Sequence, residues 1–237
     1  KVLSCSIVSS PTAAAETQRR HLDLRLEGVH KRFGIAVALT DVDLAIGVDT
    51  HLLLVGTNGA GKTTLLRLLA GLTGPSEGRV TIGGQDPRRS TQQRARLGLL
   101  SHQTLLYDDL TAAENLTFFA GLYGLGADSV SAALADVDLH DHAAARVGGF
   151  LRGMKQRLAL ARATLHAPEV LLLDEPFTGL DRPSARALSA RLQQRTASTC
   201  VSSVLVTHNV EAAAGLVNRI VVLRGGRIVC DEGWTVG

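Results

Sequence analysis

A glycine-rich segment that joins an apolar run to a helical pattern constrains the fold of this chain most strongly. The apolar run is His51–Val55, the segment Gly56–Thr63 reads GTNGAGKT, and the pattern of Thr63–Ala70 predicts a helix. In the motif G-x-x-x-x-G-K-[ST], backbone N–H groups and the start of the helix surround phosphate oxygens. We therefore predict a buried strand, a phosphate-binding loop and a helix, with Lys62 reaching the β and γ phosphates and Thr63 binding Mg²⁺.

A pair of carboxylates follows a second apolar run. Val170–Leu173 reads as a buried strand, and Asp174 and Glu175 come directly after it. An aspartate at such a strand end can lie beside the Mg²⁺ of a bound nucleotide, and the adjacent glutamate can orient or deprotonate the attacking water. Taken alone, the pair could simply end a strand. The phosphate-binding loop upstream favours the functional interpretation.

Strand and helix patterns alternate on both sides of a long helical block. Alternating apolar residues in Leu22–Leu26 and Val42–Ile46 predict two half-exposed strands, and residues 111–166 show helical periodicity. Further strands and helices and a final hairpin follow this block. We predict an α/β domain that carries a helical insertion.

Composition excludes several classes of protein. Of the 237 residues, 45% are hydrophobic and 20% are charged, which is typical of a globular protein and not of a disordered chain. No apolar run approaches the roughly 18 residues of a membrane helix. Aromatic residues make up 3% of the chain and the net charge is +3, so we expect no nucleic-acid partner.

The cysteines predict a reducing compartment. Cys5, Cys200 and Cys230 are widely spaced and fit neither a disulfide framework nor a zinc-binding pattern. We expect free thiols and a cytoplasmic location. Residues 1–20 contain no apolar core of the kind found in signal peptides, so we expect them to form a flexible tail.

From Leu22 to Val229 the chain resembles an ATP-binding cassette (ABC) ATPase, and its motifs occur in the order of that family. They are Phe33 as the adenine-stacking aromatic, Gly56–Thr63 as Walker A, Gln103 as the Q-loop, Phe150–Met154 with Lys155-Gln156-Arg157 as the signature and its helix, Asp174-Glu175 as Walker B, Gly179-Leu180-Asp181 as the D-loop and His208 as the H-loop. The resemblance implies one ABC ATPase domain over 21–237, of the α/β class, with a P-loop NTPase core (a mixed sheet with an antiparallel β subdomain) plus an inserted helical subdomain. Its nucleotide-binding core comprises 21–102 and 167–237, and its helical insertion spans about 103–166.

The resemblance implies that two cassettes close head to tail, with ATP and Mg²⁺ held between Walker A of one and the signature of the other. It assigns catalytic roles to Glu175, His208, Gln103 and Lys62; nucleotide contacts to Phe33, Gly56, Asn58, Gly59, Ala60, Gly61, Lys62, Thr63, Thr64, Leu151, Gly153 and Asp181; and metal contacts to Thr63, Gln103 and Asp174. Energy released in the site would change the equilibrium between open and closed dimers, which a membrane partner converts into movement.

Several of these residues have plainer interpretations when taken singly. Gln103 alone would be a solvated loop residue, His208 a capping or core histidine, and Phe33 a core residue. His140-Asp141-His142 lies in the helical block without further metal ligands nearby in sequence, so we interpret it as a solvated loop. The arginines at 88, 89, 94 and 96 are interpreted as a solvated basic face, with a lipid or partner contact as the alternative.

The signature departs from the family pattern. Leu151 stands where the family has a serine that donates to the γ-phosphate, and Arg152 replaces the first signature glycine. Losing a hydrogen bond to a charged group costs about 1.5–3 kcal/mol. We therefore expect slow turnover or a weak closed homodimer. This departure motivates the alternative function, an ATP-dependent dimerisation switch with weak hydrolysis and no role in transport.

Three stretches resemble the haem-exporter ATPase of cytochrome c maturation: Ser101–Tyr107, Leu110–Phe119 with Leu122–Leu125, and Arg152–Arg157. The resemblance implies a transporter motor that sits on the inner face of the plasma membrane. Its partners would be integral membrane subunits and a second cassette, in a homodimer or a heterodimer. A small-molecule kinase is a remote alternative, because the signature, D-loop and H-loop have no role in such an enzyme.

Overall fold

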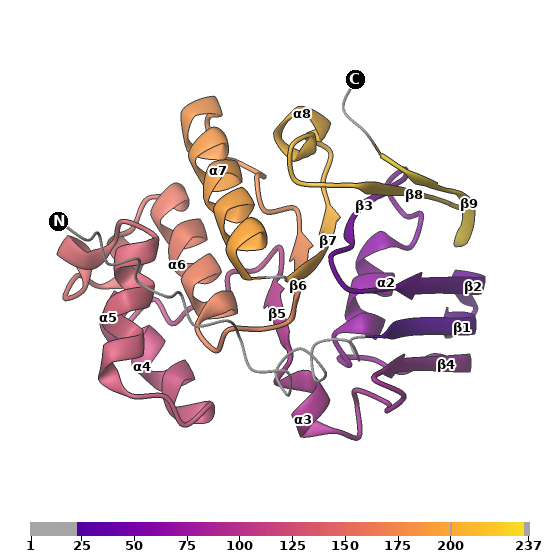
Figure 1. Ribbon diagram of the computed structural model, residues 1–237, viewed down its shortest axis with the longest axis horizontal. Helices are drawn as coiled ribbons and strands as arrows, with labels where there is room; N and C mark the ends of the chain where they lie inside the picture. Colours follow the sequence, from indigo (N-terminus) through magenta and orange to yellow (C-terminus); the bar gives the residue numbers. More distant parts are fainter. Residues whose placement is uncertain (1–22, 200, 235–237) are drawn as a thin grey trace, which may run out of the picture.

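Two sheets form the framework of the protein (Figure 1). The computed structural model describes residues 23–199 and 201–234, so the predicted tail 1–20, Cys5 and Cys200 lie outside the described residues. The smaller sheet is antiparallel, with the strand order β2 (Ala36–Ile46), β1 (Leu24–Phe33), β4 (Glu77–Ile82). It matches the predicted antiparallel subdomain.

The larger sheet is mixed. Its order is β5 (Leu97–Leu100), β6 (Val170–Asp174), β7 (Ser202–Val206), β3 (His51–Val55), β8 (Arg219–Arg224) and β9 (Arg227–Gly233). Neighbours from β5 to β8 pair in parallel, and β9 runs antiparallel to β8. Every residue of β6 and β7 is buried, as expected for strands covered on both faces. The predicted fold class is confirmed, although β5 was not predicted.

Helix α2 (Lys62–Leu69) lies between the two sheets. It contacts β2 and β4 of the smaller sheet and β6 and β7 of the larger sheet. Leu65, Leu66, Leu68 and Leu69 are all buried in the apolar cluster that joins the sheets. The predicted helix at 63–70 is confirmed to within one residue.

A group of helices stands beside the larger sheet, at the left of Figure 1. It contains α4 (Ala112–Leu122), α5 (Ala127–Asp136) and α6 (Arg152–Thr164), with short 3₁₀ turns at His140–His142 and Val147–Gly149. These helices pack around an apolar cluster of their own. Helix α6 also contacts β5, and this contact joins the group to the sheet.

The remaining helices are α3 (Thr91–Arg94), α7 (Arg182–Thr199) and α8 (Val210–Ala213). Side chains of α7 and α8 pack with β6, β7 and part of α6 in a third apolar cluster. This cluster covers the face of the larger sheet that α2 leaves open. The structure thus buries both faces of the parallel strands, as their apolar sequences require.

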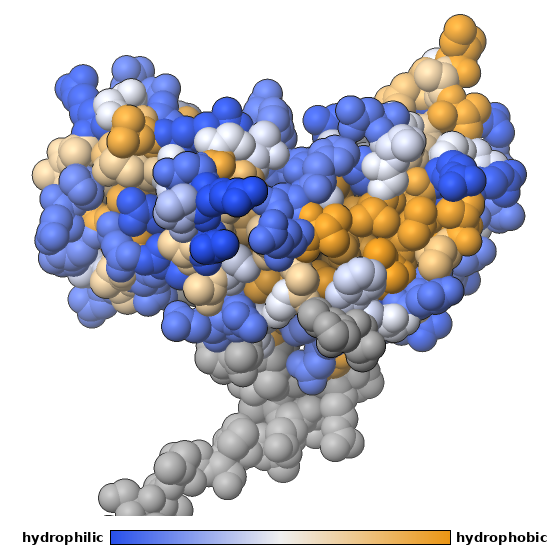
Figure 2. All heavy atoms as spheres, turned by 90° about the horizontal axis from the view of Figure 1, so that it is seen from above, coloured by the Kyte–Doolittle hydropathy of each residue, from blue (hydrophilic) through white to orange (hydrophobic). Residues whose placement is uncertain are grey.

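Some apolar side chains remain on the surface. Figure 2 shows that apolar residues gather on the half of the molecule that contains the small antiparallel sheet. Phe33, Ile35 and Val37, at the turn between β1 and β2, are all exposed. Within the described residues, none of the helices is long and apolar enough to cross a membrane.

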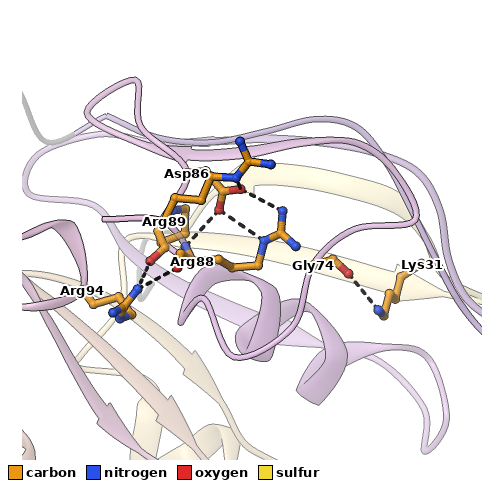
Figure 3. A network of polar contacts seen from close by, with 7 residues as sticks. Lys31, Gly74, Asp86, Arg88, Arg89 and Arg94 are labelled. Atoms are coloured by element: carbon orange, nitrogen blue, oxygen red, sulfur yellow. Dashed lines mark hydrogen bonds and ion pairs between the residues drawn. The ribbon is translucent and has the colours of Figure 1, made fainter. Parts of the chain in front are cut away.

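The arginine-rich segment after β4 is largely tied into the structure. Arg94 donates to the carbonyl oxygens of Pro87 (2.8 Å) and Arg88 (2.9 Å), while Asp86 pairs with Arg88 and lies 3.9 Å from Arg89 (Figure 3). Arg96 forms a two-pronged ion pair with Glu169. The predicted solvated basic face is therefore wrong for Arg94 and Arg96, because both guanidinium groups serve as internal hydrogen-bond donors.

The contact between β5 and α6 yields a test of the packing. A Cβ at Gly98 would collide with the main-chain oxygen of Ala163 and crowd Leu171 and Pro168. We expect Gly98→Ala to lower the free energy of unfolding by about 1–3 kcal/mol, measured by urea denaturation.

Gly121→Ala is the matched control. Gly121 is exposed near the end of α4, and nothing lies within 4 Å of an added Cβ. This change should raise the free energy of unfolding by about 0.5–1 kcal/mol, because alanine favours the helix. Equal stabilities for the two variants would contradict the close approach of α6 to β5.

Candidate nucleotide-binding site

Four neighbouring parallel strands end at the same edge of the larger sheet, and each leads into a predicted site residue. The order β5, β6, β7, β3 places the segments after these strands side by side. They carry Gln103, Asp174 with Glu175, His208 and the loop Gly56–Thr63, respectively. The carboxyl ends of parallel strands are the usual place for a ligand in an α/β sheet.

The loop before α2 exposes the start of that helix. Gly61, the residue that precedes α2, has a φ of 106°, and a Cβ there would lie 2.6 Å from the carbonyl oxygen of Ala38. Only glycine fits this position. No side chain caps α2 and its first turn contains no acidic residue, so its first N–H groups and the positive end of its dipole are available to an anion.

Lys62 lies across this loop. Its Nζ atom donates to the carbonyl oxygens of Gly56 (2.7 Å) and Thr57 (3.0 Å), and the residue is only 8% exposed. These bonds hold the ammonium group over the loop without neutralising its charge. A buried cation beside free N–H groups is well suited to bind phosphate oxygens.

Thr63 and Asp174 bring two oxygen ligands together. The Thr63 hydroxyl is 3.5 Å from Asp174 Oδ1. Burial raises the pKa of Asp174 and the charge of Glu175 adds to this effect, while the Thr63 hydroxyl lowers it. A carboxylate in such a setting gains from a nearby cation. Hydroxyl and carboxylate oxygens are ligands that Mg²⁺ prefers, and this ion commonly completes its shell with water and phosphate oxygens. The residues therefore fit Mg²⁺ bound with a nucleotide.

Glu175 is held in an unusual backbone conformation. Its φ is 53°, which few residues other than glycine adopt, and its N–H group donates to Val206. Oε2 accepts from the hydroxyl of Thr178 (3.2 Å) and the N–H of His208 (3.3 Å). Oε1 is buried without a hydrogen bond and lies 3.3 Å from His208 Nε2. One carboxylate oxygen is thus fixed and the other is available to a water molecule or to the imidazole.

These residues line one cavity of about 600 Å³. Its wall includes Asn58, Gly59, Ala60, Gly61, Lys62, Thr63, Thr64, Gln103, Asp174, Glu175 and His208. The sequence prediction missed Arg67, His102 and Leu105, which line it as well. For His102 and Leu105, the available signal was their position near Gln103 in the sequence. Phe33 is not part of this wall: it is 51% exposed, and Lys31 Nζ lies 4.7 Å from the centre of its ring.

The other predicted contacts form a second hollow of about 470 Å³, and the two hollows share no lining residue. Leu151, Gly153 and Asp181 line it. Leu151 directly precedes α6, is 76% exposed and provides no cap to the helix. Asp181 caps α7 through the N–H of Ser184 (2.9 Å), and hydrogen bonds from Ser184 lower the pKa of this carboxylate. The structure therefore places the signature and the D-loop together, apart from the phosphate-binding loop.

Arg152 has a partner that the sequence did not reveal. Its Nε atom donates to the carbonyl oxygen of Thr178 (3.1 Å), and its guanidinium group packs against Gly179. The substitution of the first signature glycine therefore places a cation against the D-loop. This contact links the start of α6 to the segment that follows Glu175.

Comparison with known proteins agrees with this geometry. A profile of the ABC transporter family matches residues 39–178. The ABC transporter ATP-binding protein NatA of Bacillus subtilis is 37% identical, over 82% of this chain and 81% of that protein. The Nod factor export ATP-binding protein I of Cupriavidus pinatubonensis is 38% identical, over 88% of this chain and 65% of that protein. The daunorubicin resistance ATP-binding protein DrrA2 of Streptomyces coeruleorubidus is 37% identical, over 88% of this chain and 66% of that protein.

Solved structures give the same result. The ATP-binding subunit of an ABC transporter superimposes with a TM-score of 0.80 at 27% identity, over 89% of this chain and 90% of that one. The ATP-binding cassette MJ0796, a dimer in a post-hydrolysis state with ADP and phosphate, also gives 0.80 at 25% identity, over 90% of this chain and all of that one. This chain belongs to the ABC transporter family, as an ATP-binding subunit with ATPase activity.

Proposed function

We propose that the chain hydrolyses ATP in the cavity at the start of α2 and thereby drives separate membrane subunits. The observation that carries this proposal is the meeting of Lys62, Thr63, Asp174, Glu175 and His208 in one cavity, at the ends of adjacent parallel strands. A phosphate-binding cradle, a pair of Mg²⁺ ligands and a carboxylate oxygen that accepts no hydrogen bond are groups that suit phosphoryl transfer to water.

Each side chain has a defined task in this proposal. Lys62 and the loop N–H groups bind the β and γ phosphates. Thr63, Asp174 and Gln103 would hold Mg²⁺, which when bound would supply positive charge to the phosphate oxygens. Glu175 Oε1 orients the attacking water and accepts its proton, and His208 Nε2 steadies the γ-phosphate. Phe33 stays a proposed adenine contact that lies outside the cavity wall described above.

The second hollow supports a two-cassette arrangement. Because Leu151, Gly153 and Asp181 lie apart from the phosphate-binding loop, we propose that they contact the nucleotide held by another cassette. The dimeric state of MJ0796 is consistent with such pairing. The proposed division into a core of 21–102 and 167–237 and an insertion at about 103–166 is supported by the separate apolar cluster of α4–α6. We place the complex at the inner face of the plasma membrane, where membrane subunits would hold it.

Haem export in cytochrome c maturation is the narrower form of this proposal. It rests on the sequence similarity of three segments to the haem-exporter ATPase: Ser101–Tyr107, Leu110–Phe119 and Arg152–Arg157. None of these segments contacts cargo in the proposed mechanism. Two of the relatives described above are named for Nod factor export and daunorubicin resistance. A pull-down of the tagged chain from solubilised native membranes with Mg-ATP, followed by identification of each recovered protein, tests the cargo. Recovery with cytochrome c assembly proteins supports haem export, and an unrelated permease contradicts it.

An ATP-dependent dimerisation switch with weak hydrolysis is the second candidate. Leu151 favours it, because no hydroxyl is present at the start of α6 to donate to a phosphate. Turnover measured with and without the membrane partners separates the two functions. A motor hydrolyses ATP faster with its partners. A switch hydrolyses ATP slowly under both conditions, and no membrane protein is recovered with it in the pull-down.

Glu175→Gln tests the proposed role of the carboxylate. The amide cannot accept a proton, so kcat for ATP hydrolysis should fall at least about 100-fold while ATP binding is retained. Phosphate release and nucleotide binding are measured on the same sample. Glu232→Gln, an exposed carboxylate change on β9, is the control and should leave both unchanged. A Glu175→Gln protein with more than about a tenth of wild-type turnover would contradict the role.

Leu151→Ser tests the effect of the altered signature. The new hydroxyl can donate to the phosphate across the dimer, so we expect turnover to rise roughly 10-fold or more. Leu151→Ala removes the same apolar side chain without adding a donor and should give no such rise. Steady-state hydrolysis across a range of protein concentrations measures both variants. A serine variant no faster than wild type would show that the missing hydroxyl does not limit turnover.

A further inference from the structure

Helix α6 holds both ends of the segment that carries Gln103. At one end, Arg162 Nη2 donates to the carbonyl oxygen of Leu99 at 2.7 Å. At the other end, Lys155 Nζ donates to Asp108 Oδ1 at 2.8 Å. Lys155 and Arg162 are seven residues apart, so they lie on the same face of α6, about two turns from each other. The nucleotide-facing segment is thus attached twice to a single helix.

The Arg162 anchor exists because β5 is an edge strand of the larger sheet as described. The carbonyl oxygens of Leu97 and Leu99 receive no bond from a further strand, and they accept instead from His166 Nε2 (2.9 Å) and Arg162. The guanidinium group also lies 5.3 Å from the centre of the Phe119 ring, on α4. The Arg162 guanidinium group is poorly solvated, and this burial lowers its pKa. A hydrogen bond in such surroundings, here the one to Leu99, is strong.

The Lys155 anchor is part of a second fixed point. The Asp108 carbonyl oxygen accepts from the N–H of Gly148 at 2.8 Å. The preceding residue, Tyr107, exchanges two hydrogen bonds with the fully buried side chain of Asn115, at 2.8 and 3.0 Å. These contacts fix the chain where it enters α4. The backbone of Asp108 is therefore fixed in place where its side chain pairs with Lys155, although this side chain is 63% exposed.

The chain between the anchors is held by few hydrogen bonds, although Leu106 packs against two of the apolar clusters. Among the described residues, the hydrogen bond found within 101–106 joins the Ser101 hydroxyl to the Gln103 carbonyl oxygen, and none ties these residues to another element. Gln103 and Leu105 line the nucleotide cavity from this segment. A shift of Gln103 toward a bound nucleotide therefore pulls on its two ends, and both ends are attached to α6.

We propose that Lys155 and Arg162 are positioning residues that clamp residues 99–108 to α6, so that Gln103 and this helix move together. The start of α6 carries Gly153 into the second hollow. The clamp therefore relays the state of the nucleotide cavity to the surface proposed to receive another cassette. This inference rests on the proposed role of Gln103 and adds the two side chains that transmit its movement.

Reversing the charge of Lys155 tests the clamp. Lys155→Glu places two carboxylates together, and we expect kcat for ATP hydrolysis to fall about 3- to 10-fold with KM for ATP changed less than about twofold. The exchange Lys155→Glu/Asp108→Lys restores an ion pair with opposite polarity and should bring kcat back to within about twofold of wild type. A lasting loss in the exchange variant, or no loss in Lys155→Glu, overturns the clamp.

Two controls make the result specific. Arg219→Glu reverses the charge of a basic side chain about as exposed as Lys155, in the ion pair between Arg219 and Asp231 on the terminal hairpin, and should leave kcat unchanged. Gln103→Ala distinguishes a failure of the clamp from a failure of the proposed role of Gln103. A loss of kcat in Gln103→Ala without one in Lys155→Glu overturns the clamp alone, whereas an unchanged kcat in Gln103→Ala overturns the proposed role of Gln103.

Arg162 provides an independent test of the other anchor. Arg162→Lys retains the charge but loses the planar group that reaches Leu99 and stacks on Phe119. We expect kcat to fall about as much as in Lys155→Glu, again with little change in KM, and the thermal midpoint is measured alongside. Wild-type kcat in this variant would overturn the two-point arrangement.

Discussion

The free start of helix α2 is the feature on which the rest of the site depends. Its first N–H groups are uncapped, no acidic residue lies in its first turn, and the buried cation of Lys62 adds to the positive potential. Such an arrangement suits a phosphate group. The two sheets that enclose α2 fix its direction, and the close approach of Gly61 to Ala38 fixes the loop. The carboxylates and the histidine are then delivered by neighbouring strands that end at the same edge.

The separation of the two hollows is the basis for the proposed dependence on a second cassette. The phosphate-binding loop and the signature lie in one chain but line different surfaces, so a nucleotide in the first cavity is not enclosed by its own signature. Helix α6 connects these surfaces. It begins at the second hollow, packs along β5 and holds the Gln103 segment at Leu99 and Asp108. The proposed clamp would link events at the two surfaces through this one helix.

Local chemistry decided which parts of this structure could be predicted from sequence. The loop Gly56–Thr63 and the strand before Asp174 were predictable because phosphate binding fixes residue types and spacing. The strand β5 was not, because its four residues contain Gly98 and become a strand only by pairing with β6. The role of Arg96 escaped prediction for the same reason, since its partner Glu169 is 73 residues away. Contacts of this kind depend on the fold and leave no local pattern.

The most direct test of the account mixes two inactive variants. Lys62→Ala removes the phosphate-binding cation, and Gly153→Asp places a carboxylate at the start of α6. If each active site combines the loop of one chain with the signature of another, a mixed dimer regains one intact site. Equal amounts of the two variants should then recover about a quarter of the wild-type ATPase rate, although neither variant hydrolyses ATP alone. A mixture as inactive as its components would contradict the composite site.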